Sequence, residues 1–206
     1  MTGPGRIWLM VSAATAAALS WVLFIAVARP GWAEAALERT GRGTSEENMA
    51  DSTVTVRLMG DDGRLTEPVT VPRVVKSDDE WRRQLTPEQY RITRGKGTER
   101  AFCGRFNDHK QPGRYDCVGC ALPLFDARAK FDSGTGWPSF FRPVAAENIR
   151  TETDISWGML REEILCARCG AHLGHVFDDG PAPTGLRYCL NSESLIFVPD
   201  SRQSKP

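Results

Sequence analysis

Two Cys-x-x-Cys pairs, CVGC (Cys117 and Cys120) and CARC (Cys166 and Cys169), constrain the fold of this 206-residue chain more than any other feature. A tight turn at each pair can direct two sulfurs at one ion, and two such turns complete a tetrahedral thiolate site. The pairs lie farther apart than in short zinc ribbons, so the ion would join two distant segments of one domain. We therefore predict one structural Zn²⁺ ion per chain, bound by these four cysteines.

Two other uses of the cysteines stay open at this point. The chain has six cysteines, which in an oxidising compartment can form three disulfides. A Cys-x-x-Cys pair can also be a redox motif, although that form usually follows a strand and opens a helix. The symmetry of the two pairs favours a metal site over both alternatives.

The composition indicates a packed globular protein that does not bind nucleic acid. The chain contains six Trp and nine Phe, and 41% of its residues are hydrophobic. Basic and acidic residues are equal at 26 each, and no basic stripe of the kind that phosphate binding requires is present. We expect no nucleic-acid partner and a monomeric protein.

The N-terminal part of the chain differs from the rest. Residues 7–28 follow Arg6 and carry no charge, and RPGWAEAA then places small residues as a signal peptidase requires. The run exceeds the usual apolar region of about 7–15 residues, so residues 1–35 are either a signal peptide or a membrane anchor through residues 7–28. Both place the remainder outside the cytoplasm, with the periplasm favoured. Translation from Met49 would instead leave the protein in the cytoplasm.

The remaining chain divides into four segments. We expect a linker at 36–52, an N-terminal strand extension at 53–76, the main domain at 77–200 and a tail at 201–206. Within the extension, TVTVRLM alternates as a strand does, and DDG is typical of a turn.

Two short helices open the main domain, and each begins with a capping box. Ser77 is followed by Glu80, and Thr86 is followed by Pro87 and Gln89. Beyond residue 115 the chain is a series of short runs broken by Gly, Pro, Asp and Asn. These patterns predict a mainly β fold of antiparallel sheets with two short N-terminal helices.

Cys189 lies in RYCLNSESLIFV, a segment that we interpret as one strand. Alternation along a strand places Tyr188 and Leu190 toward the core, with Cys189 and Asn191 on the opposite face. The positive charge of Arg187 is expected to lower the pKa of the thiol and make it reactive. The alternative is an inert, buried cysteine.

Two further segments supply residues suited to chemistry. CGAHLGHVFDDG contains His172 and His175, two of the three histidines of the chain. Beside a free cysteine they suggest an activated nucleophile, whereas a lone histidine is more often structural. FDSGTGWPSFF places Trp137 on a loop shaped by Gly and Pro, either as core packing or as the wall of a small apolar pocket.

Taken together, GTERAF, CVGCALPLF, KFDSGTGWPSFF and CARCGAHLGHVFDDGPAPTGLRYCLNSESL resemble the B-type methionine sulfoxide reductases, which reduce the R epimer of methionine sulfoxide. The resemblance begins near KSDDEWRRQL and ends at about Val198. It implies a tent-like arrangement of antiparallel sheets, with a zinc site of four cysteines that lies remote from the active site. It also implies that oxidised-methionine proteins or peptides are the substrates.

The resemblance further implies the roles of individual residues. The family has a catalytic cysteine, polar partners around it, an indole that binds the substrate methyl group, and charged residues that line the same pocket. In this chain they are, in that order, Cys189; His172, His175 and Asn191; Trp137; and Asp179 and Arg187.

One departure from the family concerns the resolving cysteine. Many members read Ser-Gly-Cys-Gly-Trp-Pro, whereas this chain reads SGTGWP, with Thr135 in place of that cysteine. Cys103, in AFCG, is the one cysteine left without a role, and the resemblance assigns it as the resolving thiol. A Cys103–Cys189 disulfide would then be reduced by a thioredoxin-like dithiol. Otherwise an external thiol regenerates Cys189 directly.

A zinc-stabilised binding module without catalysis is the alternative function. The Cys-x-x-Cys pairs alone fit such a module. It would leave Cys103, Cys189, Trp137 and His175 without a purpose, and the balanced charge does not favour a nucleic-acid ligand. We therefore expect an enzyme, a peptide-methionine (R)-S-oxide reductase.

Overall fold

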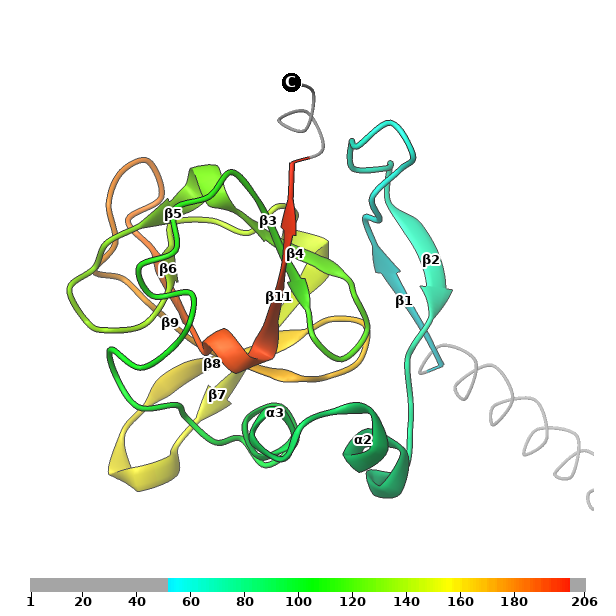
Figure 1. The fold of residues 1–206 in the computed structure, drawn as a ribbon, viewed down its shortest axis with the longest axis horizontal. Helices are drawn as coiled ribbons and strands as arrows, with labels where there is room; N and C mark the ends of the chain where they lie inside the picture. The colour runs from blue at the N-terminus through cyan, green and yellow to red at the C-terminus, as the bar shows by residue number, and fades with distance from the viewer. Residues whose placement is uncertain (1–51, 201–206) are drawn as a thin grey trace, which may run out of the picture. The chain divides into compact units, whose positions relative to one another are not determined.

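The computed structural model describes residues 52–200, and the β-strands in this range all pair antiparallel. A six-stranded sheet has the order β5-β6-β10-β9-β8-β7, and a three-stranded sheet has the order β11-β3-β4. A separate hairpin pairs β1 with β2 (Figure 1). The prediction of a mainly β fold with antiparallel sheets is confirmed.

The elements have the following bounds. The six-stranded sheet comprises β5 (Lys130–Phe131), β6 (Ser139–Phe140), β7 (Ile149–Asp154), β8 (Arg161–Cys166), β9 (His172–Phe177) and β10 (Arg187–Leu190). The other strands are β1 (Thr53–Val56), β2 (Val69–Pro72), β3 (Gly113–Cys117), β4 (Pro123–Asp126) and β11 (Leu195–Pro199). Single 3-10 turns are η1 (Ala127–Ala129), η2 (Ala146–Asn148), η3 (Ser156–Gly158) and η4 (Ser192–Ser194).

The two helices, α2 (Asp78–Gln84) and α3 (Pro87–Thr93), are short, as predicted, and both capping boxes are formed. The side-chain oxygen of Ser77 accepts from the backbone N–H of Glu80, and the Glu80 carboxylate accepts from the Ser77 N–H in return. Such short helices are not stable alone, so their apolar residues must attach them to the sheets. Trp81 of α2 and Ile92 of α3 are both buried and provide this attachment.

The core between the two sheets is built on aromatic rings. Tyr115 of β3 packs edge-on against Phe140 of β6 with ring centroids 5.1 Å apart, and Phe125 of β4 lies 4.8 Å from the same ring. All three side chains are fully buried. Because β3 and β4 belong to one sheet and β6 to the other, these contacts hold the two sheets together.

The segment RYCLNSESLIFV is not one strand, which corrects the sequence-based interpretation. It forms β10, the η4 turn and β11, and the two strands belong to different sheets. The turn forms because the backbone N–H groups of Ser192 and Glu193 donate to the buried carboxylate of Glu99, at 2.8 and 3.3 Å. A partner far away in sequence therefore ends the strand. The expected alternation holds within β10, where Leu190 is buried and Tyr188 packs against the core.

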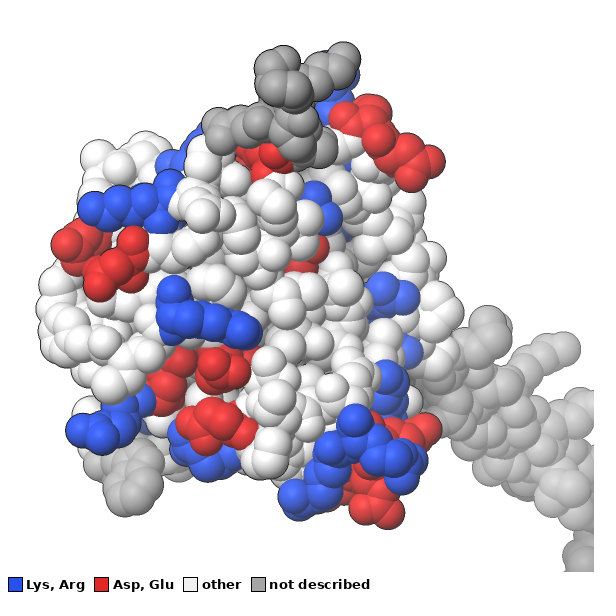
Figure 2. Space-filling view, in the orientation of Figure 1, with Lys and Arg blue, Asp and Glu red and all other residues white. Residues whose placement is uncertain are grey.

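Two sequence-based expectations lie outside the described residues. These are the signal peptide or anchor at 1–35 and the tail at 201–206; the linker is described only from residue 52. Among residues 52–200, no helix combines the length and the apolarity that crossing a membrane requires. The face shown in Figure 2 has Lys and Arg interspersed with Asp and Glu, so it carries no basic stripe.

Asn148 at the end of η2 joins the β1–β2 hairpin to the sheets. Its Oδ1 accepts from the backbone N–H of Arg57 at 2.7 Å, and its Nδ2 donates to the Arg57 carbonyl at 2.8 Å. The same Nδ2 donates to the carbonyl of Pro123 in β4 at 2.7 Å. The side chain is fully buried, so these three hydrogen bonds are shielded from water.

We expect Asn148→Ala to lower the free energy of unfolding by about 2–4 kcal/mol, because it leaves buried backbone groups without partners. Urea denaturation followed by circular dichroism measures this change. Thr55→Ala, which removes an exposed hydroxyl from the same hairpin, is the control and should cost less than about 1 kcal/mol. Equal effects of the two substitutions would contradict the role of Asn148.

Candidate functional site

Strand pairing places two of the predicted site residues side by side. Cys189 of β10 pairs with His175 of β9, and His175 pairs with Glu163 of β8. On the other side Cys189 pairs with Ser139 of β6. Paired residues in a sheet share a face, so a row of polar and nucleophilic side chains crosses the six-stranded sheet.

A cleft of about 190 Å³ opens at this row. Four predicted site residues line it together: Trp137, His175, Cys189 and Asn191. The other lining residues are Thr98, Arg161, Gly174, Phe177 and Leu190. The cleft therefore combines a thiol, an imidazole and an amide with the apolar surfaces of Trp137 and Phe177.

Trp137 and Asn191 are held in place by the backbone of one residue, Glu99. The indole Nε1–H of Trp137 donates to the Glu99 carbonyl at 3.1 Å, and Oδ1 of Asn191 accepts from the Glu99 N–H at 3.0 Å. Nδ2 of Asn191 donates to the carbonyl of Leu173 at 3.2 Å. A side-chain amide carries two N–H donors, so one remains for a ligand in the cleft.

His175 is held by a carboxylate that the sequence did not indicate. Its Nε2 lies 2.8 Å from Oδ2 of Asp154, and the guanidinium of Arg161 donates to the same oxygen at 2.6 Å. Hydrogen bonds from Ser156, and then the one from His175, hold the pKa of Asp154 well below its ordinary value. Asp154 and Arg161 are register partners at the end of the β7–β8 hairpin. Recognising that hairpin in TETDISWGMLREEI is the one signal that could have identified them.

His172 is not among the residues that line the cleft. It is buried, and its Nδ1 lies 2.7 Å from Oε1 of Glu163, whose other oxygen accepts from Lys96 at 2.7 Å. Burial lowers the pKa of His172, which favours the neutral imidazole. Its ring lies 5.5 Å from that of His175.

Asp179 and Arg187 form an ion pair beside the cleft and are not among its lining residues. Nε and one terminal nitrogen of Arg187 each donate to a different oxygen of Asp179 at 2.8 Å. The Arg187 guanidinium also lies 4.4 Å from the ring centroid of Phe177. Arg187 is buried and Asp179 is exposed, so the pair fixes the arginine next to Cys189.

The expected lowering of the Cys189 pKa is wrong. Burial raises the pKa of this thiol above its ordinary value, because an apolar environment disfavours the thiolate. The charge of Arg187 and hydrogen bonds from Thr135 and Arg187 oppose this effect without cancelling it. The sequence shows Arg187 as a neighbour but does not show how deeply the strand places the sulfur.

Cys103 is exposed on the loop between α3 and β3, and it is a free thiol like the other five cysteines. The backbone N–H of its neighbour Phe102 donates to the carbonyl of Gly136 at 2.8 Å. The loop that carries Cys103 therefore docks on the segment that carries Thr135 and Trp137.

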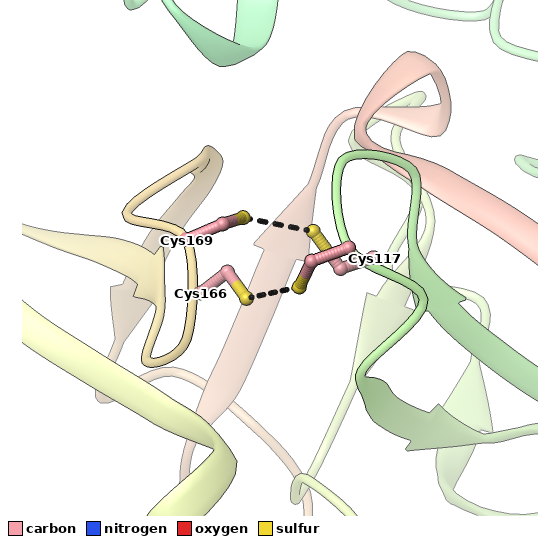
Figure 3. Close-up of side chains that lie close together, drawn as sticks. Cys117, Cys166 and Cys169 are labelled. Carbon is pink, nitrogen blue, oxygen red and sulfur yellow. Dashed lines mark hydrogen bonds between the residues drawn. The ribbon is translucent and has the colours of Figure 1, made fainter. Parts of the chain in front are cut away.

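The four cysteines of the two Cys-x-x-Cys pairs form one cluster (Figure 3). All four sulfurs lie within 4.8 Å of one another; Cys117 and Cys169 are 3.6 Å apart, and Cys120 and Cys166 are 3.5 Å apart. Tetrahedral coordination at about 2.3 Å requires sulfurs about 3.8 Å apart, whereas a disulfide is about 2.05 Å long. The cluster can hold a metal ion, and it does not support the three-disulfide alternative.

Comparison with known proteins gives one consistent result. The SelR domain family matches residues 85–199. The peptide methionine sulfoxide reductase MsrB of Hahella chejuensis is 62% identical over 125 residues, which are 61% of this chain and 90% of that protein. MsrB of Thiobacillus denitrificans is 60% identical over 124 residues, 60% of this chain and 94% of the relative. The chloroplastic peptide methionine sulfoxide reductase B1 of Arabidopsis thaliana is 53% identical over 149 residues, 69% and 73% of the two chains.

We expect Arg187→Gln to slow alkylation of Cys189 by iodoacetamide at neutral pH. Arg187 lowers the pKa of the thiol, so its loss raises that pKa, and each unit of increase leaves about tenfold less thiolate. The rate at Cys189, followed by peptide mass spectrometry across pH, should show its midpoint at higher pH. Arg128→Gln, at an exposed arginine on the surface, is the control. A midpoint that stays in place or falls would contradict the assignment.

Proposed function

This chain belongs to the SelR-domain family, and we propose that the thiol of Cys189 performs the family's reaction, reduction of the R epimer of methionine sulfoxide in peptides and proteins. One observation carries the proposal: a single cleft combines Cys189, His175 and Asn191 with the indole of Trp137. A sulfoxide has a sulfur open to nucleophilic attack, an oxygen that must accept a proton, and an apolar methyl group. The cleft offers a partner to each of them.

Cys189 supplies the electrons in this mechanism. Its thiolate attacks the sulfoxide sulfur while the oxygen accepts a proton, and the oxygen then passes to the cysteine sulfur. Methionine leaves, and Cys189 remains as a sulfenic acid, so two electrons have moved from the cysteine to the substrate. The raised pKa of Cys189 keeps the thiol protonated in the resting enzyme. The charge of Arg187 and the hydrogen bonds from Arg187 and Thr135 favour ionisation of the thiol.

His175 is the proton donor that the geometry favours. Its Nε2 is engaged with the Asp154 carboxylate, which fixes the ring orientation. Nδ1 is then the nitrogen that can serve the sulfoxide oxygen. The second amide hydrogen of Asn191 supplies a further hydrogen bond to that oxygen.

Trp137 and Phe177 provide the apolar surface for the substrate methyl group. Both line the cleft, and the hydrogen bond from Trp137 to Glu99 fixes the indole plane. The cleft fixes where the methyl group and the oxygen of the sulfoxide must lie. Only one epimer places both groups correctly, because the other epimer has the methyl group and the oxygen exchanged around the sulfur.

Cys103 is the resolving cysteine in this proposal. Its thiol attacks the sulfenic sulfur of Cys189, a disulfide forms and water leaves; a thioredoxin-like dithiol then reduces the disulfide by exchange. Support comes from the loop, which docks at Gly136 beside Thr135 and presents an exposed thiol. The loop from Glu99 to Phe106 is bonded to Ser192 at both ends.

Zn²⁺ is the metal that best suits the cluster, bound by Cys117, Cys120, Cys166 and Cys169. A tetrahedral site of four thiolates is typical of structural zinc and leaves no position open for substrate. The ion would stabilise the turns after β3 and β8.

The function is tested with resolved epimers of a methionine sulfoxide peptide. We expect turnover of the R epimer and negligible turnover of the S epimer, measured by chromatography of released methionine peptide with dithiothreitol as the reductant. Cys189→Ser should abolish the activity, because no other thiol lines the cleft within residues 52–200. Equal use of both epimers, or activity of Cys189→Ser, would contradict the proposed site.

The role of Cys103 has a stoichiometric test. With thioredoxin as the reductant, Cys103→Ser should release about one methionine per enzyme and then stop, because each cycle leaves one sulfenic acid. Dithiothreitol should restore turnover, since a small dithiol reaches the sulfenic acid directly. Turnover of Cys103→Ser with thioredoxin at the wild-type rate would show that another thiol resolves Cys189.

A further inference from the structure

We propose that Glu99 is a positioning residue for the sulfoxide reaction. From a buried site next to the cleft, it holds the side chains of Trp137 and Asn191 in place relative to Cys189. The inference rests on the proposed function. Glu99 does not line the cleft and touches no reacting atom, so it acts through its neighbours.

The carboxylate of Glu99 closes the η4 turn. It is 7% exposed, and its two oxygens accept from the backbone N–H groups of Ser192 and Glu193 at 2.8 and 3.3 Å. Within the described part of the chain no Lys or Arg side chain pairs with it, so these N–H groups are its main partners. The Ser192 hydroxyl is a further partner of the carboxylate, and a buried carboxylate held by several donors is costly to displace.

The backbone of the same residue orients two walls of the cleft. The Glu99 N–H donates to Oδ1 of Asn191, and the Glu99 carbonyl accepts from Nε1 of Trp137. Asn191 directly precedes η4, so one residue joins the turn after Cys189 to the loop that carries the indole. Displacing Glu99 would move the amide and the indole together, and would leave β9 and β10 paired.

A carboxylate is required because two N–H donors converge on it. A carboxylate has an acceptor for each donor, whereas glutamine would direct an NH₂ group at one of them. The carboxylate is closely packed, because a Cβ on Gly104 would lie 2.3 Å from Oε1 of Glu99 and from Oγ of Ser192. Gly104 therefore provides the space in which the Glu99–Ser192 contact forms.

If Glu99 positions the cleft residues, its substitution should affect the two reactions of Cys189 differently from a substitution that only destabilises the fold. Alkylation by iodoacetamide needs an accessible thiolate and does not use Trp137 or Asn191. Sulfoxide reduction needs the thiolate and both of those side chains. A loss of positioning therefore slows reduction and spares alkylation, whereas a loosened fold changes both together.

The experiment compares Glu99→Gln with its parent in the full-length Cys103→Ser background, where one methionine is released per enzyme. We expect the single-turnover rate on an R-sulfoxide peptide to fall about tenfold or more, as for loss of a hydrogen bond to a charged group. The alkylation rate of Cys189 should stay within about twofold of the parent. Glu99→Asp keeps both acceptors on a shorter side chain and should restore part of the reduction rate.

Asp116→Asn is the matched control. Asp116 is a buried carboxylate on β3, 3% exposed and paired with Arg114, and it does not border the cleft. We expect it to lower the midpoint of thermal unfolding and to leave the single-turnover rate unchanged.

A Glu99→Gln protein that reduces as fast as its parent, or that loses reduction and alkylation in equal measure, overturns the positioning role. If Glu99→Gln does not fold, the comparison is made with Glu99→Asp, which must then reduce more slowly than the parent with alkylation spared. A parent that releases no methionine would overturn the proposed function itself and is seen before any Glu99 variant is compared.

Discussion

The four-sulfur cluster is the constraint on which the rest of the structure depends. One cysteine pair follows β3 in the three-stranded sheet, and the other follows β8 in the six-stranded sheet. An ion held by both pairs would join the two sheets, which have the aromatic rings of Tyr115, Phe125 and Phe140 packed between them. The domain is small, and such domains often add a metal to a limited hydrophobic core. Strand β10 presents the thiol of Cys189 to the cleft at the six-stranded sheet.

Three buried or half-buried carboxylates support residues in and around the cleft. Asp154 binds His175, Glu163 binds His172, and Glu99 binds the η4 turn. Glu99 lies far in sequence from the turn that it binds, whereas Asp154 and Glu163 come from the two strands before β9. The thiol lies in a less polar setting, where burial raises the pKa of Cys189. The site thus combines fixed polar partners with a nucleophile that is protonated at rest.

Local patterns predicted the local structure well. Both capping boxes begin the helices where expected, and alternation in β10 places Leu190 inside and Cys189 toward the cleft. The errors arose where a distant partner decides the outcome. The long strand through residue 198 is divided because Glu99 binds the turn, and the pKa of Cys189 is raised because neighbouring elements bury the sulfur.

The sequence by itself determined the composition of the site: two Cys-x-x-Cys pairs, a free thiol in a strand, two histidines, and an indole on a loop shaped by glycine and proline. These features depend on residue type and short spacing, which the chain carries without folding. Only the tertiary structure decided which histidine faces the thiol, which carboxylates support the site, and how deeply the nucleophile is buried. Those properties arise from contacts between residues far apart in sequence, and no local pattern contains them.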